Sequence, residues 1–161
     1  RFSQWWLWAI LIGINLLFIY GLYLQVYLHE PIGNKPASDG VLWTGWGISI
    51  FITLLMRMIF LKTVIKTDGV YMQFFPFHFK LRYFPFSELD KVFVKKYSPM
   101  MDYGGWGIRI GLFGKGTAYN ISGNTGLQLI LNNGKKILIG TKQPLALEVA
   151  LESIGQYKDQ K

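Results

Sequence analysis

Residues 41–61, VLWTGWGISIFITLLMRMIFL, form an apolar run that carries one charged side chain, Arg57. At a rise of 1.5 Å per residue, a helix of this length reaches roughly 30 Å, the thickness of the hydrocarbon core of a bilayer. Arg57 lies about one turn from the end of the run, where its long side chain can reach the lipid headgroups. The run therefore predicts a transmembrane helix.

A second apolar run, residues 5–28, precedes the first and carries no charge. It is followed by His29, Glu30 and Pro31 rather than by a small-residue cleavage site, and it is longer than the apolar core of a signal peptide. We expect a retained helix. Residues 1–61 then form a two-helix transmembrane hairpin, and residues 62–161 form a separate domain.

The basic charge belongs to the second domain. Residues 62–161 hold 14 Lys and Arg against 7 Asp and Glu, whereas residues 1–61 have a net charge of +1. Because basic segments stay on the cytoplasmic side, we expect both termini and the domain to be cytoplasmic. Tryptophans favour the membrane interfaces. The expected interface residues are Trp5, Trp6 and Trp8 on the inner side and Trp43 and Trp46 on the outer side.

Polar residues are sparse inside the two predicted spans. Asn15 in the first and Ser49 in the second lie at similar depth in an antiparallel hairpin, so we expect a hydrogen bond between the helices. A proton or ion pathway would require ionisable groups near the membrane centre, and these runs contain none there.

After a short junction, residues 61–68, the pattern changes to short β-branched and aromatic runs separated by Gly, Pro and Asn. Seven strands are predicted, at residues 70–75, 79–84, 91–97, 107–113, 117–121, 126–131 and 135–140. The period then becomes helical: Thr141 is a candidate cap, Pro144 suits a first turn, and Gly155 ends the helix.

Seven strands followed by one helix is the element order of a pleckstrin-homology (PH) domain. The stretches TDGVYMQ and LRYFPFSELDKVFV resemble the opening strands of bacterial PH-like domains. YGGWGIR, GTAYNISGNTGLQLIL and KKILIGTKQP resemble parts of small, largely uncharacterised bacterial membrane proteins with two transmembrane helices and a PH-like domain. The resemblance implies a β-barrel or sandwich of seven antiparallel strands capped by the C-terminal helix. It also implies a bacterial inner (plasma) membrane location and a binding function.

The YGGWGIR stretch supplies the first candidate binding residues, Tyr103, Trp106 and Arg109. Clustered glycines let a backbone approach a partner closely, and Tyr, Trp and Arg dominate protein interaction sites. The alternative is a tight bend in which Trp106 covers the domain core and Arg109 pairs with Asp102.

A second set of candidates, Lys66, Lys80 and Arg82, lies around the aromatic stretch of residues 74–79. Such cations can bind a phosphate or an anionic lipid headgroup. An aromatic loop beside lysines can also dip into the membrane interface. The alternative is that the phenylalanines fill the core.

The sequence contains few residues that could carry out catalysis. The chain has two histidines and no cysteine, and no His pair has metal-ligand spacing. The GLFGKGT segment fails the spacing of a phosphate-binding loop, and no basic stripe on a known module indicates nucleic-acid binding. We expect no enzyme activity, cofactor or metal. The expected function is interaction with another membrane protein or with itself; the alternative is sensing of anionic membrane lipids.

Overall fold

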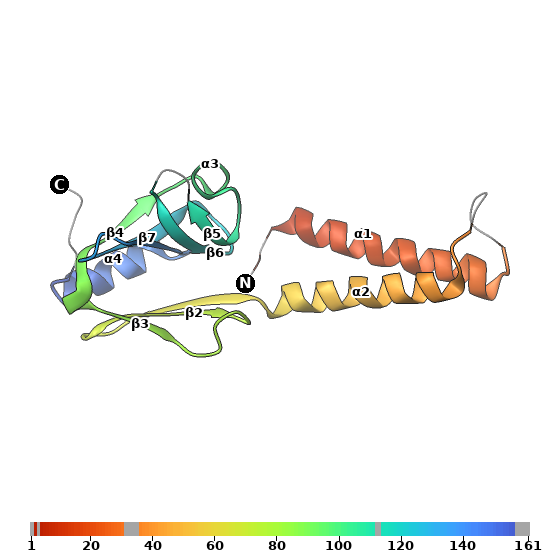
Figure 1. The fold of residues 1–161 in the computed structure, drawn as a ribbon, viewed down its shortest axis with the longest axis horizontal. Coiled ribbons are helices and arrows are strands. Elements are labelled where there is room, and N and C mark those ends of the chain that lie inside the picture. Colours follow the sequence, from red (N-terminus) through yellow and green to blue (C-terminus); the bar gives the residue numbers. More distant parts are fainter. Residues whose placement is uncertain (1, 3, 31–35, 112–113, 157–161) are drawn as a thin grey trace. The chain divides into compact units, whose positions relative to one another are not determined.

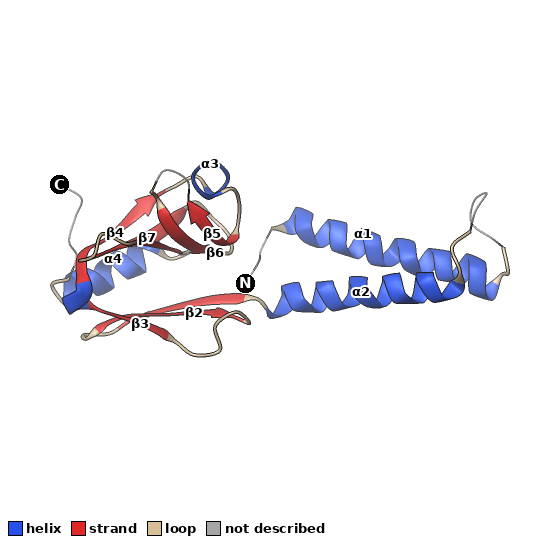
Figure 2. Cartoon of the chain, in the orientation of Figure 1, coloured by secondary structure: helices blue, strands red, loops and turns tan. Residues whose placement is uncertain are grey.

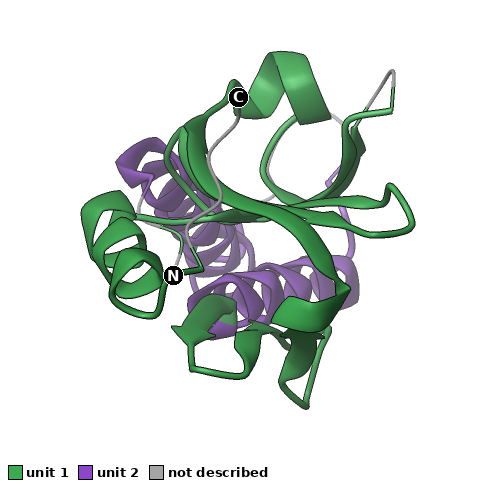
Figure 3. Ribbon diagram, turned by 90° about the vertical axis from the view of Figure 1, so that its left-hand side faces the viewer, with its two compact units in different colours: residues 1–2, 59–161 green, residues 3–58 purple. Residues whose placement is uncertain are grey.

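The computed structural model describes residues 2, 4–30, 36–111 and 114–156. They form two compact units, residues 3–58 and residues 1–2 with 59–161, coloured separately in Figure 3. Residues 112 and 113, at the end of a predicted strand, lie outside the described residues, as do residues 31–35 of the loop between the helices.

The first unit is a helical hairpin (Figure 2). It comprises α1 (Trp5–Leu22), a π-helical continuation η1 (Tyr23–Tyr27) and α2 (Asp39–Met58). Both helical segments are long and apolar enough to cross a membrane, as predicted. Most of their large apolar side chains face outward, as lipid-facing side chains would. α2 ends at Met58, three residues before the predicted end.

Polar and small residues make the contacts between α1 and α2. The Asn15 side-chain amide donates to the Thr53 hydroxyl at 3.0 Å. The predicted interhelical hydrogen bond therefore forms, but Ser49 is the wrong partner. Ser49 lies one turn away and its carbonyl accepts from Thr53 at 2.8 Å. Gly45 faces the Phe18 ring so closely that an added Cβ would lie 2.6 Å from it.

The expected interface tryptophans lie near the starts of the two helices. Trp5, Trp6 and Trp8 occupy the first turn or so of α1, and Trp43 and Trp46 occupy the first two turns of α2. The Trp43 and Trp46 rings contact each other, with centroids 5.5 Å apart.

In its described residues the second unit contains two open sheets, two α-helices and a 3-10 helix, η2 (Phe86–Glu88) (Figure 1). The three-stranded sheet has the order β1-β2-β3, and the five-stranded sheet has the order β4-β7-β8-β6-β5. The strands are β1 (Phe60–Ile65), β2 (Gly69–Phe75), β3 (Arg82–Pro85), β4 (Leu89–Lys96), β5 (Gly107–Gly111), β6 (Gly116–Asn120), β7 (Thr125–Leu131) and β8 (Lys136–Gly140).

Three features differ from the predicted domain. The junction prediction was wrong, because Phe60–Ile65 forms β1, paired along its whole length with β2. The strands are not all antiparallel, since β6 pairs with β8 in parallel. The sheets also remain open, so the closed PH-like barrel is not confirmed.

The core lies between the two sheets. Alternate residues of β2, namely Val70, Met72 and Phe74, point inward, as do Leu127 and Leu129 of β7. The predicted C-terminal helix is present as α4 (Pro144–Ser153), which contacts β4 and β7 of one sheet and β1 of the other. The helix thus helps to close one side of the sandwich.

A short helix, α3 (Pro99–Tyr103), follows β4 and was not predicted. The Ser98 hydroxyl accepts a hydrogen bond from the Met101 N–H, and the Asp102 carboxylate accepts one from the Ser98 N–H. Gly104, at φ 69°, ends the helix in the left-handed conformation that glycine adopts without strain.

Candidate functional site

Strand β5 forms one edge of the five-stranded sheet and pairs only with β6. Its three central residues, Ile108, Arg109 and Ile110, are all exposed, although successive residues of a strand point to opposite faces. Ile110 is 82% exposed. Met100 and Met101 of α3, the helix that contacts β5, are exposed as well. We call the exposed residues of β5 and α3 the β5 edge.

The three candidates from YGGWGIR separate by burial. Tyr103 is only 4% exposed and packs with Tyr97, Ala118 and Leu138. Its hydroxyl donates to the Lys115 carbonyl at 3.3 Å. Tyr103 was predicted to contact a partner, but its ring lies in this core cluster and supports the surface from below.

Trp106 and Arg109 lie nearer the surface. Trp106 is half-buried, and its indole N–H has no acceptor among the described residues. Arg109 is exposed, and its Nε donates to the Trp106 carbonyl at 3.1 Å. Trp106 directly precedes the exposed strand and Arg109 is its central residue, so both remain candidates for partner contact.

Asp102 pairs with Lys115 rather than with Arg109. The hydrogen bond from Lys115 lowers the pKa of the Asp102 carboxyl, and the bond from the Ser98 N–H lowers it further. Arg109 makes no ion pair within the described parts of the chain, so its charge is available at the β5 edge.

Lys66, Lys80 and Arg82 do not converge on one site. Lys66 lies in the turn between β1 and β2, with its ammonium group 4.8 Å from the centroid of the Tyr71 ring. Lys80 follows the other end of β2, roughly 20 Å away along an extended strand. The Arg82 guanidinium donates to the Tyr119 hydroxyl at 2.6 Å and lies over the Phe84 and Tyr119 rings. The predicted grouping of these cations is wrong, because β2 separates them.

The loop of residues 76–81 between β2 and β3 exposes aromatic side chains. Phe79 is 76% exposed and its ring meets Phe75 edge-on, while Phe77 is also exposed. Phe75 stacks on Phe60, the first residue of β1. The loop therefore lies at the end of the three-stranded sheet where β1 begins, and β1 begins two residues after α2 ends.

His78 in the same loop is half-buried. Burial lowers the pKa of its imidazole, and the nearby Arg82 charge lowers it further. Across the described ranges, no three His, Cys, Asp or Glu residues cluster so as to hold a metal ion.

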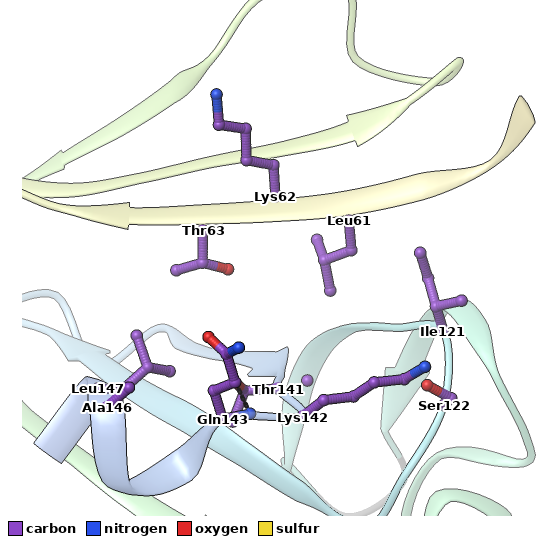
Figure 4. Close-up of a pocket in the computed structure, with 11 residues that line it drawn as sticks. Leu61, Lys62, Thr63, Ile121, Ser122, Thr141, Lys142, Gln143, Ala146 and Leu147 are labelled. Atoms are coloured by element: carbon purple, nitrogen blue, oxygen red, sulfur yellow. Dashed lines mark hydrogen bonds between the residues drawn. The ribbon is translucent and has the colours of Figure 1, made fainter. Parts of the chain in front are cut away.

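A pocket of about 390 Å³ lies between β1, the loop after β6 and the start of α4 (Figure 4). We call it the β1–α4 pocket. Leu61, Ile121 and Leu147 give it an apolar wall. Its polar lining residues are Lys62, Thr63, Ser122, Thr141, Lys142 and Gln143. No carboxylate lines it, so its charge is positive.

Successive side chains of β1 point alternately into the pocket and away from it. Leu61 and Thr63 of β1 point into the pocket, whereas Lys62 points away from it (Figure 4). Ser122 is only 9% exposed. Figure 4 shows the ammonium end of Lys142 directed toward the Ser122 hydroxyl. The pocket therefore contains one inward-facing cation and several hydroxyl groups.

Sequence reasoning missed Ser122 and Lys142 as site residues. They lie in two loops that are twenty residues apart, and only the parallel pairing of β6 with β8 brings the ends of those strands together. One local signal was present: Lys142 lies just before the predicted start of a helix, and the N-terminus of a helix favours anions.

No model of a known protein family matches the chain, and no curated protein matches its sequence. The function therefore has to follow from the geometry of the two units.

Proposed function

We propose that this protein is a membrane-anchored, non-enzymatic interaction module of the bacterial inner membrane. The hairpin holds the protein in the bilayer, with both termini and the PH-like domain on the cytoplasmic side. The domain binds another membrane protein, or a second copy of this chain, as an accessory or self-associating component of a complex. Binding uses the β5 edge.

The observation that carries this proposal is the exposure of β5 on both faces at an unpaired sheet edge. An edge strand presents unpaired backbone N–H and C=O groups to which an extended segment can add as a further strand. Proteins that do not use such an edge protect it with charges, proline or a covering loop. Here Ile108 and Ile110 occupy it, with Arg109 between them to favour an acidic partner segment.

The test is a pull-down of the tagged full-length protein from native membranes in mild detergent, with crosslinking and mass spectrometry. A lysine at an edge strand opposes pairing, so Ile110→Lys should abolish recovery of a stoichiometric partner. Trp106→Ala and Arg109→Ala should weaken it. Val149→Lys, at an exposed position on α4, is the matched control. Equal recovery with Ile110→Lys and the parent would refute the use of the β5 edge.

A second candidate function, contact with anionic membrane lipids, is favoured by the exposed aromatic loop of residues 76–81. Phe77 and Phe79 are of the type that enters the headgroup region, and Lys80, which follows Phe79, would attract anionic lipids. The position of this loop near the start of β1 supports it, because only Ile59 separates β1 from α2.

The absence of native cysteine makes the loop accessible to site-specific labelling. A nitroxide attached at Phe79→Cys in lipid nanodiscs should be accessible to oxygen, which partitions into the bilayer, and poorly accessible to a water-soluble nickel chelate. A label at Val149→Cys serves as the control. If both labels show the same preference for the chelate, the loop does not enter the membrane.

A further inference from the structure

The β1–α4 pocket offers three kinds of group that recognise anions. The first is the inward-directed Lys142 (Figure 4). The second is the N-terminus of α4, a helix of ten residues that begins at Pro144. The Gln143 side chain makes no capping hydrogen bond. The first-turn N–H groups of a helix have no acceptor within it, and they carry the positive end of its dipole.

The third group is the Ser122 hydroxyl. Ser122 is more than nine-tenths buried, and its side chain has no hydrogen-bond partner in the part of the chain that the structure describes. The Ser122 hydroxyl oxygen is not among the fully buried polar atoms that lack a partner, so it opens into the pocket. A hydroxyl that faces a pocket beside a lysine, and that no described protein group engages, can donate to a ligand that accepts hydrogen bonds.

The geometry points to a phosphate group as the ligand: we propose that the β1–α4 pocket binds the phosphate of a phosphorylated small molecule or lipid headgroup. Lys142 and the Ser122 hydroxyl would donate to its oxygens, and the start of α4 would face its charge. The volume of about 390 Å³ admits a phosphate with a few attached carbons. Leu61, Ile121 and Leu147 would contact those carbons.

This site is distinct from the β5 edge and involves none of its residues. It also differs from the cations expected to bind lipid, since Lys66, Lys80 and Arg82 do not line it. Leu61 lies three residues after the end of α2, so a lipid headgroup is one possible source of the phosphate and a soluble metabolite is the other.

The experiment titrates the full-length protein in neutral detergent with two probes, inorganic phosphate and short-chain phosphatidylglycerol, by calorimetry. Phosphatidylcholine of equal chain length controls for partition into micelles. The titrations are run at about 150 mM salt, where attraction between distant surface charges is screened. The variants are Lys142→Gln and Ser122→Ala, and the matched control is Lys66→Gln, which removes an exposed lysine that does not line the pocket.

We expect Lys142→Gln to weaken binding about tenfold, as for the loss of one hydrogen bond to a charged group. Ser122→Ala should weaken it several-fold without loss of folding, because it deletes an unpaired hydroxyl. Lys66→Gln should leave both affinities unchanged. Tighter binding of phosphatidylglycerol than of phosphate and phosphatidylcholine would identify a lipid headgroup; equal or tighter binding of phosphate would identify a soluble ligand.

The proposal is overturned if neither probe binds, or if Lys66→Gln weakens binding as much as Lys142→Gln does. The second result would indicate a general attraction to a basic surface. Ile110→Lys, which tests the β5 edge, should not change either affinity, so the two proposals can fail independently.

Discussion

Leu151 and Leu145 allow the docking of α4 to be measured with one chemical change at two sites of the same helix. Leu151 is fully buried at 0% exposure, whereas Leu145 is 74% exposed. Alanine is as good a helix former as leucine, so replacing either residue leaves helix propensity nearly unchanged. The difference between Leu151→Ala and Leu145→Ala therefore reports burial alone.

The expected magnitude follows from the atoms removed. Leucine to alanine deletes three carbon groups, worth roughly 2.5 kcal/mol of transfer free energy at about 0.8 kcal/mol each. The cavity left between α4 and the sheets raises the loss in free energy of unfolding to about 3–5 kcal/mol. At the exposed Leu145, the same change should cost about 0.5 kcal/mol or less.

Pulse proteolysis of the full-length protein in mild detergent, across a urea series, measures this difference. With a denaturant slope of roughly 1–3 kcal/mol per molar, Leu151→Ala should lower the unfolding midpoint by about 1 M or more. Leu145→Ala should leave the midpoint near that of the parent. Equal midpoints for the two variants would refute the reasoning, because α4 would then not be docked against the sheets through Leu151.

Three further outcomes are expected. The lowered pKa of Asp102 stabilises the fold fully above the unfolded value of 3.8, and this contribution is lost as the pH falls through the folded pKa. Asp102→Asn should therefore lower the urea midpoint at about pH 7, and this loss should shrink as the pH is lowered stepwise below 3.8. A loss that stays the same at every pH would contradict this. Gly45→Leu should separate α1 from α2 through collision with Phe18, and Phe18→Ala should restore the spacing, as measured between spin labels on the two helices. If the domain is cytoplasmic, a cysteine at Leu145 in intact cells should react with a membrane-impermeant maleimide only after permeabilisation; labelling of intact cells would reverse the topology.

The helices were predictable because each is defined by local sequence. An uninterrupted apolar run long enough to cross a bilayer is a property of the run alone, and the structure confirms both. The start and end of α4 were predicted from Pro144 and Gly155, because these helix boundary signals are also local. Strand positions from β4 onward were also close to those predicted, because Gly and Asn mark the turns between them.

β1 could not be recognised from its own residues. FLKTVI continues the apolar character of α2 and has no turn signal before it. It becomes a strand because β2 offers partners for all six of its residues, from Phe60 opposite Phe75 to Ile65 opposite Val70. Helix α3 was missed for a related reason: five residues are too few for a periodic pattern, and the helix depends on capping by Ser98 and Asp102.

The sequence by itself determined two apolar spans, a basic second domain, and most of the strands and the final helix, because length, charge and period are local quantities. The tertiary structure decided which residues can meet a ligand or partner. It buried Tyr103, separated Lys66 from Lys80 by the length of β2, left β5 exposed at a sheet edge and brought Ser122 to Lys142. Burial and proximity depend on strand order, and strand order is set by pairing between segments far apart in the chain.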